Sequence, residues 1–316
     1  MKILRRIGIG FVGFLAVAWV ALLALAYWPS GIEEAPARQL AGPDDRFVTF
    51  DGLELRYREY GQAGPDRPTL VLIHGFGNSL QSFRLVAPLL ADDYHVIAVD
   101  LPGFGLSAKP ADFDYRNANQ ARVMGDFIRA LGLDDVIVGG HSLGGSIALR
   151  VAVSEPEVRG LVLMNPGIIN SGVPAIAQYY FFPMQRLLAK QLGKRDFRES
   201  MIKGSFINPD VITDEVMDNL QRASQSEGYL AGMTTMMGQY EAPDEEPLLA
   251  EARLPTVIVW GELDRRKTPE ELARLEAGLP NDRTLKVPGV GHYVHEEGAD
   301  AVAAGLVDMK AFLTSG

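Results

Sequence analysis

The sequence predicts an α/β fold with a mostly parallel eight-stranded sheet and helices on both of its faces. The main observation is that short apolar runs alternate with amphipathic helical stretches from residue 69 onward, a rhythm typical of parallel strands joined by helices. A second observation concerns the β-rich segments Arg46–Phe50 and Leu53–Tyr60, which flank the turn signal Asp51-Gly52 and predict an antiparallel hairpin. The chain has 316 residues, enough for one large α/β domain with an insertion.

Six further strands and five helices follow the hairpin. The strand segments are short apolar runs of the kind that lie buried in a parallel sheet: Thr69–Ile73, His95–Val99, Val136–Val138, Leu161–Met164, Thr256–Trp260 and Leu285–Val287. The helical segments have apolar residues at helical spacing: Leu80–Leu90, Ala118–Leu131, Ser142–Val153, Pro269–Gly278 and Ala299–Phe312. With the hairpin, these strands make the eight of the predicted sheet.

The alternation stops between residues 167 and 249, where helical patterns occur without a convincing strand. Ala175–Leu192 and Thr213–Met237 carry this pattern, together with many aromatic and methionine residues. We therefore predict a helical insertion, called the cap below, at residues 167–249. The α/β core then consists of residues 46–166 and 250–316.

An apolar segment precedes the body of the chain. Basic residues stand at positions 2, 5 and 6, and no charge follows from Ile7 to Trp28. As a helix this run is about 33 Å long, which matches the ~30 Å hydrocarbon core of a bilayer. Residues 1–30 are therefore predicted as a transmembrane anchor, with a linker at 31–45. A cleaved signal peptide is the alternative, since Ala24-Leu25-Ala26 resembles a cleavage site.

Charge placement around the segment predicts its orientation. The basic residues before it and Glu33-Glu34 after it favour a cytoplasmic N-terminus and a body on the non-cytoplasmic side of the membrane. That location is the periplasm if the source is bacterial, or the exterior if the leader is cleaved.

Composition excludes several functional classes. The net charge is −10, and the body of the chain contains no basic stretch that would follow a phosphate backbone, so we expect no nucleic-acid partner. The chain has no cysteine, which excludes disulfides, thiolate metal sites and a cysteine nucleophile. The five histidines show no metal-ligand spacing. We expect neither a metal nor a cofactor, and the sequence does not predict an oligomeric state.

The sequence Gly140-His141-Ser142-Leu143-Gly144 contains the pattern G-x-S-x-G between a strand and a helix. Small residues on either side allow a sharp turn, which exposes the serine Oγ at the helix N-terminus. There the helix dipole and the Leu143 N–H face a developing oxyanion. Ser142 is therefore the candidate nucleophile, and the alternative is a serine that merely caps the helix.

A serine nucleophile needs a base and an acid that orients this base. Asp264 follows the strand Thr256–Trp260, and His292 follows Leu285–Val287, in the order Ser, Asp, His. We predict His292 as the base and Asp264 as its partner. Glu262 and His295 are the alternatives to Asp264 and His292, respectively.

The loop after the strand Thr69–Ile73 is rich in glycine and reads His74-Gly75-Phe76-Gly77. Such a loop can direct a backbone N–H at the carbonyl oxygen held over the nucleophile. Phe76 and Leu143 are the predicted oxyanion donors, supported by the loop residues Gly75 and Gly77. For His74 we favour a ring that ties the loop together over one that touches the substrate.

These motifs resemble those of the α/β-hydrolase superfamily. The similarity extends from about Arg46 to Phe312 and includes, in family order, HGFG at 74–77, DLPGFGLS at 100–107, GHSLGG at 140–145, GELD at 261–264 and GVGHYVHEE at 289–297. The leader, the HGFG loop, the serine elbow and the cap look like the bacterial lipase/esterase branch related to membrane-anchored monoacylglycerol lipases. The serine departs from haloalkane dehalogenases and epoxide hydrolases, whose elbow carries an aspartate. C–C bond hydrolases of aromatic ring-cleavage pathways share the same machinery.

We therefore expect a membrane-tethered serine hydrolase of carboxylic esters, acting on a small-molecule substrate through an acyl-enzyme. Lipid-derived esters such as monoacylglycerols or medium-chain acyl esters are favoured, because a tethered enzyme meets substrates that partition into the bilayer. One alternative is a C–C hydrolase, which a pocket arginine that binds a carboxylate would support. The other is a ligand-binding protein of low turnover on the same fold.

Overall fold

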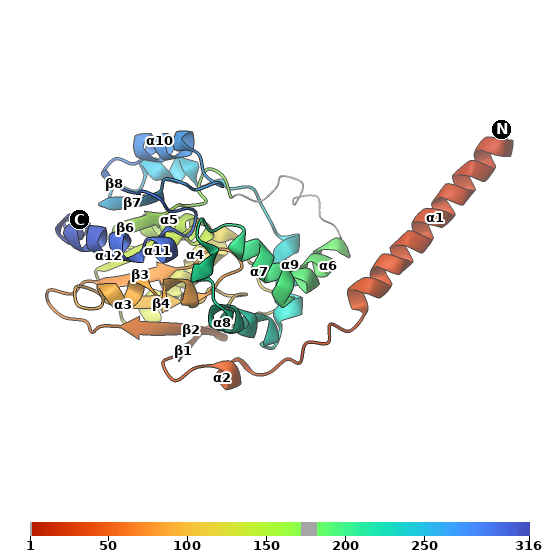
Figure 1. Ribbon diagram of the computed structural model, residues 1–316, viewed down its shortest axis with the longest axis horizontal. Helices are drawn as coiled ribbons and strands as arrows, with labels where there is room; N and C mark the ends of the chain where they lie inside the picture. Colours follow the sequence, from red (N-terminus) through yellow and green to blue (C-terminus); the bar gives the residue numbers. More distant parts are fainter. Residues whose placement is uncertain (1, 172–181) are drawn as a thin grey trace.

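The computed structural model describes residues 2–171 and 182–316, and an α/β body dominates it (Figure 1). One eight-stranded sheet has the order β1-β2-β4-β3-β5-β6-β7-β8. β1 pairs with β2 and β2 with β4 in antiparallel fashion, and the other pairs are parallel. The strands are β1 Arg46–Phe50, β2 Leu53–Tyr60, β3 Thr69–Ile73, β4 His95–Val99, β5 Val136–His141, β6 Val158–Met164, β7 Thr256–Gly261 and β8 Asp282–Val287. The predicted fold class is confirmed.

The predicted hairpin agrees with the structure residue for residue. Asp51 and Gly52 both have positive φ, of 48° and 77°, which is the backbone that a tight two-residue hairpin turn requires. Several other strands begin earlier or end later than predicted, because neighbouring polar or glycine residues join the sheet.

Helices cover both faces of the sheet. In the core they are η1 Leu80–Phe83, α3 Val86–Leu90, α4 Asn117–Ala130, α5 Leu143–Ser154, α10 Pro269–Gly278, α11 Val294–Glu297, α12 Ala299–Asp308 and α13 Lys310–Leu313, and η4 Glu246–Ala250 lies where the cap joins the core. The helix predicted at Leu80–Leu90 is in fact two, since Pro88 has no N–H to bond the Arg84 carbonyl. The helix predicted at Ala299–Phe312 is interrupted at Met309, where the sequence contains no helix breaker.

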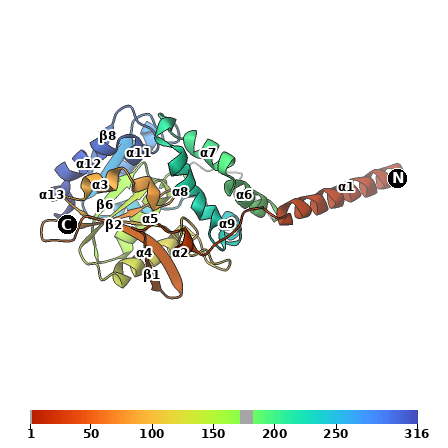
Figure 2. The same cartoon turned by 60° about the horizontal axis from the view of Figure 1, so that its bottom comes forward.

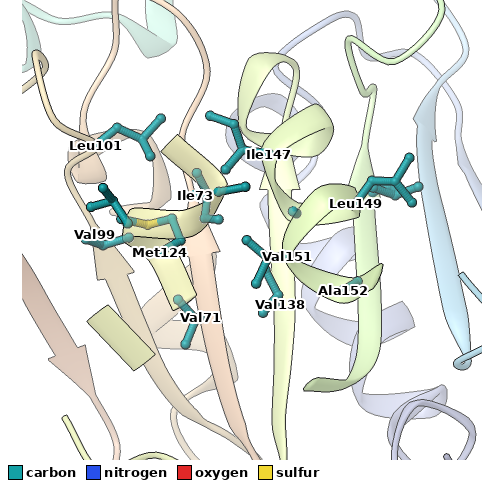
Figure 3. Packing of buried hydrophobic residues seen from close by; sticks show 14 of the residues in the cluster. Val71, Ile73, Val99, Leu101, Met124, Val138, Ile147, Leu149, Val151 and Ala152 are labelled. Carbon is teal, nitrogen blue, oxygen red and sulfur yellow. The ribbon is translucent and has the colours of Figure 1, made fainter. Parts of the chain in front are cut away.

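Alternate strand residues enter two separate cores, as a strand buried on both faces requires. Val71 and Ile73 of β3 join Val138 of β5 in the cluster under α4 and α5, where Figure 3 shows them beside Met124 of α4. Leu70 and Leu72 point to the opposite cluster, which packs under α3 and α12. The carboxyl ends of the parallel strands are thereby held rigidly, and the candidate catalytic loops follow these ends.

The cap lies between β6 and β7 and is helical in the residues that the structure describes. Its elements are α6 Met184–Leu192, α7 Arg195–Lys203, η3 Pro209–Val211, α8 Asp214–Gln225 and α9 Tyr229–Gly238. The helix predicted at Thr213–Met237 is interrupted at Gly228, whose left-handed φ of 81° suits glycine. The helix predicted at Ala175–Leu192 lies partly outside the described residues, and α6 begins at Met184.

The N-terminal helix α1 Lys2–Tyr27 projects away from the body, and its C-terminal end meets α6 (Figure 2). Its segment Ile9–Tyr27 has a mean hydropathy of 2.5 and is long enough to cross a membrane. Arg186 Nε donates to the Ala26 carbonyl at 3.1 Å. Lys190 Nζ donates to the carbonyls of Leu25 and Trp28 at 2.8 and 2.7 Å. Two cations of the cap thus bind the negative end of the helix dipole.

The stretch predicted as a linker is held against the body. It contains the short helix α2 Ala37–Leu40. Ala35 exchanges backbone hydrogen bonds with Gln225 and Glu227 beside α8. Asp45 is ion-paired with Arg58 at 2.5 Å. The segment is therefore packed at both ends rather than extended freely in solvent.

Candidate active site

Ser142 lies in the sharp turn between β5 and α5. Its φ of 51° and ψ of −117° are strained for a residue with a side chain. The turn needs glycine on both sides, because a Cβ on Gly140 would lie 2.0 Å from the Gly144 carbonyl oxygen and one on Gly144 would lie 2.1 Å from the Ile73 oxygen. The Ser142 side chain makes no capping hydrogen bond to α5. This geometry does not fit the alternative role of a helix cap.

His292 and Asp264 are brought together by the loops after β8 and β7. His292 Nδ1 lies 2.7 Å from Asp264 Oδ2. An ionised carboxylate only accepts hydrogen bonds, so Nδ1 carries the proton and Nε2 is left as a base. His292 and Ser142 line the same small cavity.

The carboxylate of Asp264 is held in its ionised form. Burial by itself raises the pKa, but hydrogen bonds from His292, the Arg266 amide and Asn165 outweigh it, and the pKa lies below its ordinary value. Asn165, which directly follows β6, donates from Nδ2 to Asp264 Oδ2 at 2.6 Å. Its Oδ1 accepts the Gly261 amide at 2.9 Å. Sequence reasoning missed Asn165, and the signal available was only an asparagine directly after a buried strand.

The two alternative residues lie elsewhere. Glu262 is exposed to solvent. His295 is fully buried, and its ring centroid lies 4.5 Å from that of His141. Among the described residues neither nitrogen of His295 has a hydrogen-bond partner. Burial, with the nearby His292 and Arg84, lowers the pKa of His295 to about 3, so the ring is neutral.

The loop after β3 approaches the serine closely. A Cβ on Gly75 would lie 3.2 Å from Ser142 Cβ, and Gly77 has a left-handed φ of 72°. Within the described part of the chain, the backbone N–H groups of Phe76 and Leu143 donate to no protein acceptor. Both residues line the large cavity beside Ser142. The two amides are therefore available to a negatively charged oxygen.

The ring of His74 connects the two glycine-rich loops behind the site. Its Nδ1 lies 2.8 Å from the Gly75 carbonyl oxygen, and its Nε2 accepts the Leu101 amide at 3.2 Å. The side chain is fully buried, and burial lowers its pKa below the usual range. The ring therefore ties the two loops together.

Two cavities meet at Ser142. The larger has a volume of about 470 Å³ and is lined mostly by apolar side chains of the core and of the cap helices α6, α7 and α9, among them Phe104, Leu188, Leu192, Met201 and Met236. The smaller, of about 70 Å³, is lined by His292, Tyr293, Ser205 and Arg266, and shares Ser142 with the larger. The arrangement places a large, mostly apolar chamber and a small niche that contains His292 and Arg266 beside one nucleophile.

Three arginines line these cavities, and sequence reasoning placed none of them there. Arg150 pairs with Asp244 and with Glu245, the latter at 3.0 Å. Arg116 pairs with Asp114 at 3.2 Å. Arg266, by contrast, forms no ion pair within residues 2–171 and 182–316. A search of the same residues finds no group of three histidines or carboxylates placed to hold a metal.

Comparison with known proteins identifies a matching family model and several relatives. A family model described as alpha/beta hydrolase fold matches residues 68–299. Lipase 1 of Psychrobacter immobilis is 28% identical over 269 residues, which cover 83% of this chain and 82% of the lipase. The 2-hydroxy-6-oxo-6-(2'-aminophenyl)hexa-2,4-dienoic acid hydrolase of Metapseudomonas resinovorans is 32% identical over 286 residues, 85% of this chain and 93% of that enzyme.

A solved structure of a membrane phospholipase A also matches the chain. It has a TM-score of 0.67 and 28% sequence identity, and the match covers 97% of this chain and 99% of that protein. Such coverage cannot leave out all of α1, whose 26 residues are more than 3% of the chain.

Proposed function

The chain belongs to the alpha/beta hydrolase fold family, and we propose that it is a serine hydrolase of carboxylic esters. In this proposal Ser142 is the nucleophile, His292 the general acid and base, and Asp264 the residue that orients His292. The single observation that carries the proposal is the contact of 2.7 Å between His292 and Asp264 in a cavity that His292 shares with the strained Ser142.

The proposed reaction uses each group in turn. His292 Nε2 takes the proton of Ser142 Oγ as this oxygen attacks the acyl carbon. The N–H groups of Phe76 and Leu143 stabilise the oxyanion. His292 then gives the proton to the leaving alcohol and afterwards activates a water, which releases the acid from the acyl-enzyme. No step requires a cofactor.

The substrate class we propose is a lipid-derived ester, such as a monoacylglycerol or a medium-chain acyl ester. The large apolar cavity, about 470 Å³, supports this, since it offers room and apolar contact for an acyl chain. The similarity to a lipase and to a membrane phospholipase A is consistent with it.

We further propose that α1 stays attached as a membrane anchor, with the catalytic body on the non-cytoplasmic side. Its apolar length supports a span. The bonds from Arg186 and Lys190 to Leu25 and Ala26 support retention, because cleavage after Ala26 would remove these two carbonyls from the body. Carbonate washing of membranes tests the anchor: an integral protein of full mass stays in the pellet, whereas a cleaved one is found in the soluble fraction.

The test of the enzymatic function compares the wild type with Ser142→Ala on p-nitrophenyl esters from acetate to palmitate and on mono-, di- and triacylglycerols. We expect hydrolysis with a maximum at medium chains or at monoacylglycerol, and its loss in the variant by at least about 10³-fold. Hydrolysis that survives in Ser142→Ala contradicts the mechanism. Absence of hydrolysis and of fluorophosphonate labelling would favour the ligand-binding alternative.

A C–C hydrolase is the second candidate, favoured by Arg266, a pocket arginine without a carboxylate partner among the described residues. Such enzymes act on acids, and Arg266 would bind the carboxylate. Loss of the colour of a 2-hydroxy-6-oxo-hexadienoate in the presence of the protein, faster than any ester hydrolysis, would support this candidate.

A further inference from the structure

The small cavity differs from the large one in the reactive group that it contains. His292 lines the small cavity and is not among the residues that line the large one. The leaving alcohol must lie against His292, because His292 protonates it. The alcohol part of the ester therefore occupies the small cavity, while the acyl chain occupies the apolar one.

Arg266 is the cation of this alcohol site. Its Nη2 donates to Ser205 Oγ at 2.6 Å, which is its side-chain hydrogen bond within the described residues. Arg116 and Arg150 of the large cavity are already neutralised by carboxylates. The guanidinium of Arg266 has further N–H donors in a planar fork, and it is exposed to solvent.

We propose that Arg266 binds a phosphate group on the alcohol part of the ester, so that the enzyme prefers glycerophospho-esters to neutral acylglycerols. This inference rests on the proposed ester hydrolase function. A guanidinium fork matches the oxygens of a phosphate, and a cavity of about 70 Å³ holds several water-sized groups. The phosphate is part of the substrate. Arg266 therefore binds the alcohol end of the ester and the apolar cavity binds its acyl end, with Ser142 between them.

The hydrogen bond between Arg266 and Ser205 also joins two parts of the molecule, since Ser205 belongs to the cap and Arg266 to the loop after β7. A residue that only joins the two would affect all substrates equally. The side chain of Arg265, its exposed neighbour, makes no contact with either cavity in the described part of the chain. Arg265→Gln is therefore a matched control that removes the same charge one residue away.

The experiment compares monolauroylglycerol with monolauroylglycerol 3-phosphate, two substrates that differ only in the phosphate. We expect Arg266→Gln to lower the ratio of kcat/KM for the phosphate ester over that for the neutral ester by about 10- to 100-fold, mainly through KM. Arg265→Gln is expected to keep the wild-type ratio.

Inhibition provides an independent measurement. Glycerol 3-phosphate is expected to inhibit wild-type hydrolysis of the neutral ester at least about tenfold more strongly than glycerol does, and this advantage is lost in Arg266→Gln. Equal losses on both esters, or an unchanged inhibition ratio, would show a purely structural arginine and overturn the inference. If the wild type hydrolyses neither ester, the proposed function itself is wrong, and the inference falls with it.

Discussion

The core loops and the cap form opposite walls of one site but differ in the kind of contact they contribute. The core holds Asp264 with hydrogen bonds of 2.6 and 2.7 Å from Asn165 and His292 and keeps Ser142 in a strained turn. The cap contributes mainly apolar side chains such as Leu188 and Met236. Three charged residues of the cap, Glu241, Asp244 and Glu245, also line the large cavity, whereas Arg186 and Lys190 are directed at α1.

This difference teaches that the chemistry and the choice of acyl chain are separated in the structure. Directional bonds between rigid strand ends fix atoms to within fractions of an ångström, as proton transfer requires. Apolar contacts are tolerant of shape and set only how much chain fits. Changes in the triad and in the residues that hold it are thus expected to affect all esters alike, and changes in the apolar wall of the cap to affect them according to chain length.

The largest expected effect comes from the orienting carboxylate. Asp264→Asn keeps the shape but removes the charge that fixes the His292 tautomer, and we expect kcat for every ester to fall about 10³- to 10⁴-fold. Kinetics across the ester panel measure this. Glu262→Gln, a nearby exposed carboxylate, is the control and is expected to stay within about twofold. A loss of kcat below tenfold, or a loss confined to esters with long acyl chains, would contradict the separation of the chemistry from the choice of acyl chain.

A buried ion pair lies at the boundary between the core and the cap, and it makes the free energy of unfolding depend on pH. Arg84 pairs with Glu296 of α11 and donates to the Val211 carbonyl of the cap. Burial raises the pKa of Glu296 to about 7, although Arg84 opposes the shift; the adjacent Glu297 adds to it. Asn78 donates a hydrogen bond that lowers this pKa.

Because the pKa is raised in the folded state, the folded protein binds more protons than the unfolded chain between pH 4.5 and about 7. Glu296 therefore stabilises the fold most below pH 4.5, and its contribution declines as the pH rises to 7, by up to about 3 kcal/mol. Urea unfolding at pH 5 and pH 8 measures this decline. Glu296→Gln is expected to flatten it, and an unchanged slope would contradict the assignment.

A substitution at Asn165 tests whether a residue outside the triad helps to hold Asp264 in place. Asn165→Gly removes both side-chain hydrogen bonds while it tolerates the positive φ of 40°. We expect kcat to fall about tenfold on short and long esters alike, with little change in KM, because Asp264 loses one of the groups that hold it. A loss that depends on chain length would place Asn165 with the cap instead.

The sequence predicted those parts of the molecule that depend on local chemistry and strand order. The turn at Asp51-Gly52 specifies its hairpin locally, and the placement of Asp264 and His292 after adjacent parallel strands predicted their meeting. Asn165 escaped prediction, because its bond to Asp264 spans 99 residues and depends on the register of β6 against β7.

Other features of the structure could not be predicted, because they depend on residues that are far apart in the sequence or on the absence of a contact. Within the described residues Arg266 has no ion pair, and this depends on where the acidic residues of the body lie in space, which no local sequence pattern specifies. The packing of residues 31–45 against the body is equally invisible to local sequence patterns, since Ala35 forms hydrogen bonds with residues about 190 positions away. Such contacts stabilise segments whose composition alone is typical of a linker.

The smallest expected effect belongs to the wall of the cap. Leu188 on α6 lines the large cavity, and Leu188→Trp would fill part of the space for an acyl chain. We expect the ratio of kcat/KM for a laurate ester over that for an acetate ester to fall about fivefold, since one or two lost methylene contacts are worth that much. Leu187→Trp, on the same helix but not among the lining residues, controls for damage to α6. If Leu188→Trp lowers both esters equally, α6 helps to position the triad, and the division between a chemical core and a selective cap is wrong.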